Sequence, residues 1–436
     1  MLPELATTWE HSLDFKEWTF SLRKGVTFQD RWPFTARDVV RTFQRVLNPK
    51  LGSQACQLFL LSLYPDGITI ADEHRVKFQC KVPLWNLAAM VSLPHTSIVS
   101  EDSPLDSYIA HPVGTGPFEL AHYRAAVHLF ATENQHYWRT GYPKLDAIHF
   151  FNVGDVTQRV AGMISGQFDL ILTLTPVAIQ SIRRDRRLVV ASIESGDCMN
   201  FNMRAIAKAF DDNRVQQALK FVGSRAAQVK DLRLGGATEG SDQPISPASR
   251  IGGGIKPEPY DIARTQQLPA EAGYPNGIDV TVVTSTIDPG AAEQCDAYQQ
   301  RAAPAGTRVK VQQVPTRGYY YNTDVGQYDF RVEPLAMHPD DTRFGLWYVP
   351  RGKQMAPTNW YLEEFRTLLR VARTAPEEKS RLARFTALEQ YVSDHGPSIN
   401  PVFVNVIGAH TKEVVNYAPN PMQYYRSYCQ VELTKG

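Results

Sequence analysis

Alternating apolar and polar residues mark the first predicted strands. In residues 18–22, which read WTFSL, apolar side chains take every second position, and the alternation resumes at residues 26–28 after Lys24-Gly25. An alternation of period two is typical of a strand with one buried face, and a glycine between two such runs indicates a turn. We therefore expect residues 18–28 to form a β-hairpin.

Helical spacing begins directly after this segment. Thr35 and Asp38 form a capping-box pattern, and apolar residues between Val39 and Leu47 then recur every three or four positions. This pattern predicts a helix of about three turns. The same spacing predicts four later helices, one through residues 215–222, one ending at 270–273, and two at 362–369 and 382–392.

The second half of the chain alternates between strand and helix patterns. Asn276-Gly277 precedes an alternating run at residues 278–282, and a second run at 309–311 follows an intervening helix. This order predicts a βαβ unit and an α/β fold. Upstream, residues 113–118 (VGTGPF) predict a tight turn entering a strand, and residues 235–259, rich in Gly, Ser and Pro, predict a long loop.

The composition is that of a globular protein with more than one domain. Of 436 residues, 43% are apolar and 21% charged, and 46 basic residues nearly balance 45 acidic ones. A net charge of +1 provides no global field for nucleic acid or an anionic membrane. The longest apolar stretches are far shorter than the ~20 residues that a spanning helix needs. We therefore expect no nucleic-acid partner and no membrane span.

Motifs of catalysis and cofactor binding are missing from the sequence. The chain has no GxSxG, GxxxxGK[ST], HExxH or GxGxxG motif, and its five cysteines include no CxxC pair. The glycines of 252–254 lack the Lys-Ser/Thr of a phosphate-binding loop, so a flexible turn is the favoured interpretation. We expect a protein that is not an enzyme, with no catalytic residue, metal or cofactor.

Polar residues gather in a predicted loop near residue 338. His338, Asp340 and Asp341 are potential ligands for a hard metal ion, although a solvated or capping loop is the favoured interpretation. Glu333 with Asp340 and Asp341 is a candidate acid/base set, but spacing on a loop says nothing about the separation that such catalysis requires. The sequence therefore identifies this loop as a candidate site but indicates neither metal binding nor acid/base catalysis there.

Aromatic residues precede this loop. Tyr320 lies in a run of three tyrosines, and residues 328–331 read YDFR. Aromatic side chains beside a cation suit a pocket for a polar ligand, and ordinary strand packing explains them equally well. Arg331 is the sharper signal, because an arginine in an apolar and aromatic stretch usually has a carboxylate partner from the protein or from a ligand.

Motifs in a fixed order run along nearly the whole chain. The first are at residues 3–10, 18–28 and 34–39, which read PELATTWE, WTFSLRKGVTF and FTARDV; the later ones are VGTGPF at 113–118, YWRTGYPKLD at 137–146, GQFD at 166–169, FDDNRVQQAL at 210–219 and AEAGYP at 270–275. Together they resemble the family 5 extracellular solute-binding proteins, which include dipeptide, oligopeptide and nickel receptors of ABC importers.

The resemblance implies an α/β, two-lobed fold of the periplasmic-binding-protein type II, in its large peptide-receptor variant, with a hinge between the lobes. It places the first lobe at 1–198, with an accessory subdomain at about 1–112 and a core part at 113–198. It places the second lobe at 199–404 and a return to the first lobe at 405–436.

The resemblance also implies a function. The protein is expected to capture a peptide or other small polar organic ligand between its lobes and to deliver it to the permease subunits of an ABC importer, acting as a monomer in the periplasm or at the cell surface. The expected ligand-binding residues are Arg331, Glu333, His338, Asp340, Asp341, Tyr320 and Asn202.

One position departs from the peptide receptors of the family. Those receptors often carry an aspartate that pairs with the α-amino group of the peptide, and Ala336 occupies the position that aligns with it. The sequence therefore does not favour a peptide ligand. Asp340 or Asp341, in a shifted register, is one candidate to replace that aspartate. Another possibility is that Arg331 binds the carboxylate of a zwitterionic ligand and Glu333 binds its ammonium group.

The N-terminus departs as well. Family members begin with a signal peptide and an initial strand, whereas this chain begins at the PELATTWE segment. Residues 1–6 hold no basic segment, apolar core or cleavage site of a signal peptide. We expect an N-terminally truncated chain that lacks a strand of its first lobe. A misassigned start or a trimmed chain would leave a functional parent, whereas a degraded relative of the family would have an uncovered sheet edge.

Two other classes of function stay open on sequence. The chain resembles the ligand-sensing module of some transcription regulators, which would join it to a DNA-binding domain. The other class is a hydrolase or other enzyme that uses the carboxylates between Glu333 and Asp341. This class requires a catalytic turnover that is lost when those acids are replaced.

Overall fold

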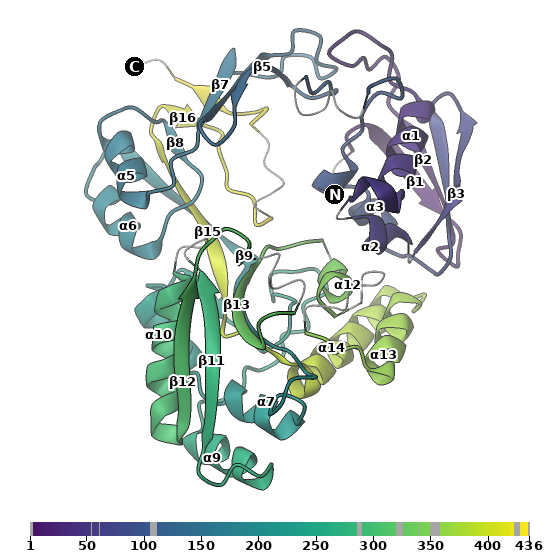
Figure 1. The fold of residues 1–436 in the computed structure, drawn as a ribbon. Helices are drawn as coiled ribbons and strands as arrows, with labels where there is room; N and C mark the ends of the chain where they lie inside the picture. The colour runs from purple at the N-terminus through teal and green to yellow at the C-terminus, as the bar shows by residue number, and fades with distance from the viewer. Residues whose placement is uncertain are drawn as a thin grey trace.

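Two lobes and an N-terminal subdomain make up the protein, as a computed structural model shows (Figure 1). The structure describes residues 3–53, 55–60, 62–104, 111–285, 290–319, 326–339, 341–348, 358–422 and 428–434. Mixed helices and strands in two lobes confirm the predicted fold class.

The N-terminal subdomain is an antiparallel sheet covered by one long helix. Its strand order is β1-β2-β4-β3, and helix α1 (Ala36–Val46) packs on β3 and β4. The capping box is confirmed, since the Thr35 amide donates to the Asp38 carboxylate at 2.8 Å and the Arg37 amide to the Thr35 hydroxyl at 3.3 Å. The other elements are β1 (Ala6–His11), β2 (Glu17–Leu22), β3 (Leu63–Asp72), β4 (Arg75–Cys80), α2 (Cys56–Leu60) and α3 (Leu87–Met90).

The predicted hairpin at residues 18–28 is wrong. Gly25 turns the chain with a φ of 73°, as expected. However, residues 26–28 form a single bridge, Thr27 to Pro33, and β2 pairs with β1 and β4 instead. Alternation shows that a strand has a buried face but not which strand lies beside it. Here one partner, β1, precedes β2, and the other, β4, lies much farther along the chain.

The first lobe contains a three-stranded antiparallel sheet and a pair of helices. Strand β5 begins at Phe118, directly after the VGTGPF turn, which confirms that prediction. The elements are β5 (Phe118–Arg124), β6 (His128–Glu133), β7 (Ala147–Phe151), α5 (Val156–Ile164), β8 (Leu170–Ile171) and α6 (Pro176–Ile182). Two short strands, β16 (Val414–Val415) and β17 (Glu432–Leu433), pair beside them.

Two long strands run from the first lobe into the second. At one end β9 (Leu188–Met203) pairs with β15 (Val402–Thr411), which in turn pairs with β8. At the other end β9 pairs with β13 (Phe330–Leu335) of the second lobe (Figure 1). The register of β15 on β9 shifts between Val404 and Val406, so the ladder is irregular where the strands cross from one lobe to the other.

The second lobe contains the predicted βαβ unit. Strand β11 (Ile278–Ser285), helix α10 (Ala291–Ala302) and strand β12 (Thr307–Val314) follow one another, and the two strands pair in parallel. This confirms the prediction from the alternation of patterns. The remaining elements are α7 (Asn213–Lys220), α8 (Arg225–Ala227), β10 (Ala237–Glu239), α9 (Ile262–Glu271), α12 (Thr342–Tyr348), α13 (Glu363–Arg373), α14 (Glu378–His395) and β14 (Ser398–Ile399).

The predicted helices occur, with small differences at their ends. Helix α7 ends at Lys220, two residues before the predicted end, and α9, α13 and α14 cover their predicted segments. The long loop at 235–259 is not all loop, because β10 pairs with β15 near its start and residues 240–246 are buried.

The N-terminal subdomain touches both lobes. On the first-lobe side, the Gln29 side chain donates to the Phe118 carbonyl at 2.8 Å, and Arg139 forms an ion pair with Glu4 at 2.9 Å. On the second-lobe side, Trp85 packs against Phe385 of α14 with ring centroids 5.9 Å apart. The three parts therefore contact one another in a cycle.

Candidate functional site

The candidate site starts from two neighbouring strands whose polar faces are buried. On β9 and β13 one face carries Phe201 and Val332, which belong to an apolar core, whereas the other face carries polar side chains. Antiparallel pairing sets Arg331 opposite Asn202 and Glu333 opposite Asn200. All four are at most 5% exposed. Because burial of polar groups costs free energy unless they are bonded, such a layer calls for an explanation.

Hydrogen bonds and an ion pair join most of this layer. Arg331 Nε lies 3.3 Å from Glu333 Oε2, which also accepts from Asn202 Nδ2 at 2.7 Å. The Asn202 carbonyl oxygen in turn accepts from Trp347 Nε1 at 3.2 Å and from Ser398 Oγ at 2.9 Å. The carboxylate partner expected for Arg331 is therefore a protein group, Glu333.

A second arginine holds the segment after β13 in place. Arg343 of α12 is 2% exposed and donates to three main-chain carbonyls, those of Leu335 at 2.8 Å, Ala336 at 2.9 Å and Pro244 at 2.7 Å. Burial lowers the pKa of this guanidinium. The residue at the position of the family aspartate, Ala336, thus has its backbone fixed by an internal cation.

The same segment is anchored where β9 crosses between lobes. The Met337 amide donates to Asp197 Oδ1 at 2.6 Å, and the Gly196 amide lies 3.2 Å from the Met337 sulfur. A Cβ at Gly196 would lie 2.9 Å from Met337 Cγ, so a side chain there would force Met337 to move. The end of β13 and the crossing point of β9 are therefore packed as one unit.

Asp341 belongs to a different cluster. It is fully buried, accepts from Asn86 Nδ2 of the N-terminal subdomain at 2.7 Å, and pairs with Arg373 of α13 at 2.5 Å. Its contacts thus join the N-terminal subdomain to the second lobe. His338, half-buried, lies between this cluster and β13 in sequence. Tyr320 and Asp340, the remaining expected residues, lie outside the described residues.

Neither metal chemistry nor thiol chemistry is indicated by the described part of the chain. It holds no group of three or more His, Cys, Asp or Glu side chains suited to a metal ion. All five cysteines are free and buried, and burial raises the pKa of Cys198, beside the polar layer, to about 11. A thiol with a raised pKa is a poor nucleophile at neutral pH.

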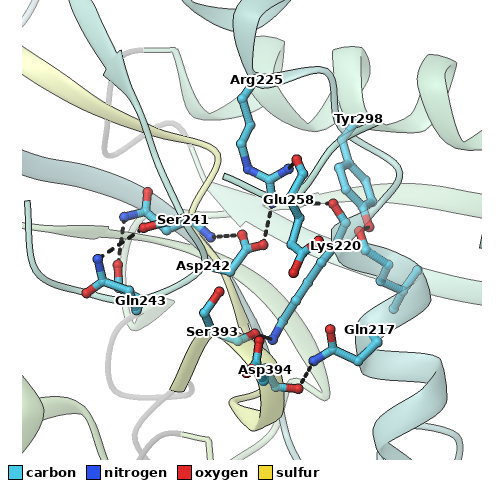
Figure 2. A network of polar contacts seen from close by, with 12 residues as sticks. Gln217, Lys220, Arg225, Ser241, Asp242, Gln243, Glu258, Tyr298, Ser393 and Asp394 are labelled. Atoms are coloured by element: carbon cyan, nitrogen blue, oxygen red, sulfur yellow. Dashed lines mark hydrogen bonds and ion pairs between the residues drawn. The ribbon is translucent and has the colours of Figure 1, made fainter. Parts of the chain in front are cut away.

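A second buried polar network lies deeper in the second lobe (Figure 2). Arg225 and Asp242 form an ion pair with side chains at most 2% exposed, and the Asn400 amide donates to Asp242 at 3.0 Å. Lys220 Nζ donates to the Ser393 carbonyl at 2.6 Å, and burial lowers the pKa of this lysine to about 8. The network ties the 235–259 segment to the helices around it, which explains why residues 240–246 are buried.

Sequence reasoning identified part of this buried polar layer and missed part of it. It brought forward Arg331, Glu333 and Asn202, which the structure joins. It missed Arg343 and Trp347, although Arg343 stands at the head of the run FGLWY and so carries the same signal as Arg331, a cation in an apolar and aromatic stretch. Asn86 carried no signal, because its partner Asp341 is 255 positions away.

No helix among the described residues is both long and apolar enough to cross a membrane.

The comparisons with solved structures give the fold. The structure matches the periplasmic binding protein AgaA from A. tumefaciens R10, in complex with agropinic acid, with a TM-score of 0.87 at 23% identity, covering 100% of this chain and 90% of that one. It matches DppA from Helicobacter pylori, in complex with the peptide STSA, with a TM-score of 0.86 at 22% identity and the same coverage.

Sequence comparison gives the family. The chain is 26% identical over 438 residues to the glutathione-binding protein GsiB of Escherichia coli O1:K1, a match that covers 95% of this chain and 82% of the relative. The comparisons give no support to a regulatory sensing module. The model of the bacterial extracellular solute-binding proteins, family 5, matches residues 1–356. The chain therefore belongs to this family and is a solute-binding receptor of an ABC importer.

Proposed function

We propose that this receptor holds a small polar organic ligand, a peptide or a similar molecule, next to the paired strands β9 and β13, and that it binds the ligand without chemical change. The observation that carries the proposal is the buried polar layer of Asn202, Arg331 and Glu333 at the junction of the lobes. A structural core has no need of such a layer, and a ligand site is where polar groups in fixed positions are useful.

The lobes in this proposal are residues 1–198 with 405–436, and residues 199–404. Both boundaries fall where β9 and β15 cross, close to the register shift at Val404 to Val406. An irregular ladder has fewer fixed hydrogen bonds to bend, so rotation of the lobes about this place is the least costly closing motion. Ligand binding then shifts the population toward the closed form that the permease recognises.

We assign two roles to the expected site residues. Arg331, Glu333 and Asn202 have internal partners, so they position the segment that follows β13. Direct ligand contact is assigned to His338, Tyr320 and Asp340, which lie on either side of β13 in the sequence. Asp341 is fully buried and bonded to Asn86 and Arg373, so it is assigned to positioning. Ala336 stands where peptide receptors of the family often carry an amine-binding aspartate. We therefore favour a ligand that is not bound mainly through a free α-amino group.

Relatives support this class of ligand without fixing its identity. Proteins of the same fold are named for agropinic acid and the peptide STSA, and the similar sequence from Escherichia coli is named for glutathione. The family is extracellular by description, and we propose the same location and a monomeric state for this chain.

A thermal-shift panel tests the proposal. Peptides, glutathione, opine-type sugar acids and metal chelates are added separately, and at least one class is expected to raise the Tm, because a ligand that binds the folded state stabilises it. Titration calorimetry then gives the Kd. A panel without any rise, with binding also undetected by calorimetry, would count against the receptor site.

A pair of histidine variants tests the location. His338→Ala is expected to weaken ligand binding about tenfold, the order of one lost hydrogen bond to a charged group. His395→Ala is the matched control, since His395 is exposed at the end of α14. Equal Kd values for both variants and the parent would place the ligand elsewhere.

A further inference from the structure

A small polar pocket lies beside the strands that join the two lobes. Its volume is about 130 Å³, and it is lined by one side of α6, by β9 and β15 near their first-lobe ends, and by the turn at residues 233–236. Its polar lining residues are Gln180, Arg183, Ser192, Arg233 and Asn405. We call it the α6–β15 pocket.

Two arginines from different parts of the chain line this pocket. Arg183 is the C-cap residue of α6 in the first lobe, and Arg233 belongs to the second lobe as its boundaries are proposed above. Among the described residues that line the pocket, none is acidic. Two like charges repel each other where little water separates them. The pocket therefore has a surplus of positive charge.

The nearest acidic residues do not neutralise these arginines. Asp185 follows Arg183 closely in sequence, but its carboxylate is bonded to Arg187 at 2.6 Å. Glu293 of α10 attracts Arg233 through space, yet within the described part of the chain neither Arg183 nor Arg233 forms an ion pair. An anion from outside the protein is therefore free to pair with both.

Arg233 is held in a fixed position. Its Nη2 donates to Gln294 Oε1 at 2.8 Å, and Gln294 Nε2 donates in turn to the Met199 carbonyl at 2.9 Å. Burial lowers the pKa of the Arg233 guanidinium. A guanidinium carries five N–H donors, and the bond to Gln294 uses one of them. A fixed and partly desolvated cation with donors to spare is suited to bind an anion.

The turn that carries Arg233 is attached to β15. The Asn405 amide donates to the Gly236 carbonyl at 3.0 Å, and the Gly236 amide donates to the Arg233 carbonyl at 2.7 Å. A Cβ at Gly236 would lie 3.0 Å from Ile407 Cδ1, so the turn packs directly on the strand. The Asn405 side chain also donates to Ser192 Oγ at 3.3 Å. Neutral hydrogen-bonding groups thus lie beside the two cations.

The size of the pocket limits what it can hold. Pockets for drug-sized ligands measure about 300–1,000 Å³. A volume of 130 Å³ equals the share of about four water molecules in the liquid. A peptide does not fit, whereas a single phosphate or carboxylate group does. The planar fork of arginine matches the oxygens of either group with paired N–H···O bonds.

We propose that the α6–β15 pocket binds a small oxyanion, a phosphate or a carboxylate group, between Arg183 and Arg233. The anion supplies the negative charge that the lining residues lack. It also links the two lobes, so its binding favours the angle between them that brings both guanidinium groups to the anion. This coupling rests on the proposed lobe boundaries, whereas anion binding itself does not.

Titration with inorganic phosphate and, separately, with acetate tests the site in the 436-residue protein without added solute. Potassium chloride at equal ionic strength controls for screening. At least one oxyanion is expected to raise the Tm by about 2 °C or more above the chloride control at saturation. The lower Kd identifies the preferred group. Failure of both oxyanions would overturn the proposal, even for a receptor that binds its solute.

Two arginine variants locate the bound anion. Arg183→Gln is expected to weaken binding of the preferred oxyanion about tenfold or more, because a charge-assisted hydrogen bond is lost. Arg183 is exposed, so this variant should fold like the parent. Arg184→Gln is the matched control, since Arg184 is exposed, carries the same charge and does not line the pocket. Equal weakening by both would show diffuse attraction to an arginine-rich turn and overturn the proposal.

A double variant tests whether one anion bridges both arginines. Arg233→Gln should also weaken binding. If the same anion contacts Arg183 and Arg233, the double variant loses less binding free energy than the sum of the two single losses. Additive losses would contradict a bridging anion.

Small-angle X-ray scattering tests the link to the lobe angle. The radius of gyration of the parent is expected to change along the same titration curve as the Tm, and to stay constant in Arg183→Gln. A constant radius in a parent that binds the oxyanion would confine the site to one rigid body and overturn the coupling between the lobes.

Discussion

Two antiparallel sheets of this receptor differ in how completely they are covered. The sheet of β1 to β4, with α1 and the segments around it, forms a core of two dozen buried residues. In the sheet of β5 to β7 a single strand residue, Ala131, reaches that degree of burial. Helix α1 packs on the first sheet, whereas a hollow lined by β7 and β8 borders the second, so the two sheets differ in what lies against them.

The comparison teaches that a complete core needs every neighbour present. In the first sheet the apolar faces meet a helix, and polar ends are satisfied by capping. In the second, a hollow lined by residues 147–153 and 167–173 borders the outer edge of β7, and Phe151 is 46% exposed. Stability is therefore expected to be uneven, high in the N-terminal subdomain and second lobe and low around this hollow.

The largest effect expected from this comparison comes from paired phenylalanine truncations. Phe43→Ala removes a ring that is 1% exposed and packs edge-on against Phe59 and Phe78, so the free energy of unfolding should fall by about 4 kcal/mol. Phe151→Ala should cost less than about 1 kcal/mol because its ring is already half in water. Urea denaturation measures both, and equal losses would erase the contrast between the two sheets.

The next effect concerns buried and exposed ion pairs. Asp242→Asn leaves Arg225 buried without its counter-charge, and we expect a loss of about 3 kcal/mol. Asp185→Asn in the first lobe is the control. Its carboxylate has a pKa lowered to about 2 by Arg187, but the arginine side chain is 65% exposed, so little stability should depend on the pair. A large loss in the Asp185 variant would show that the first lobe is more tightly organised than its core suggests.

The smallest effect is a pH dependence from Glu389 of α14. Burial raises the pKa of this carboxyl from 4.5 to about 8, with the Gly253 amide bond acting in the opposite direction. The folded state therefore binds the proton more tightly than the unfolded state. The stability that this group contributes is complete below pH 4.5 and is lost as the pH rises through 8.

Glu389→Gln should remove this dependence. The variant should match the parent near pH 5 and be more stable by about 2 kcal/mol at pH 9, less than the full shift would give because buried sites relax. Thermal unfolding from pH 5 to 9 checks the result. Parallel curves for variant and parent would mean that Glu389 is ionised in the folded state throughout.

Local rules predicted the elements of this fold well and their neighbours poorly. The Thr35 capping box, the βαβ unit and the VGTGPF turn depend on residues close together in sequence, and the structure confirms them. The 18–28 hairpin failed because β2 selects partners from β1 and β4, which the alternation does not identify. Ordered family motifs, in contrast, predicted the two-lobed architecture directly.

The site divides in the same way. Arg331 was predicted to have a carboxylate partner, and Glu333 lies two residues away on the same face of β13. The Asp341 to Asn86 bond joins residues 255 positions apart, and neither composition nor spacing predicts such a contact. Long-range pairs of this kind depend on how whole subdomains dock, which is decided by surfaces and not by local pattern.

The Asn86 to Asp341 contact also limits how the receptor can move. The N-terminal subdomain touches both lobes, through Glu4 and Arg139 on one side and Asn86 and Asp341 on the other, while β9 and β15 join the lobes directly (Figure 1). Three rigid bodies linked in a closed loop have fewer independent degrees of freedom than two bodies on an open hinge. Any rotation at the strand crossing must therefore be accompanied by sliding at one of the subdomain contacts. The angle between the lobes and the position of the N-terminal subdomain therefore change together, and neither can change alone.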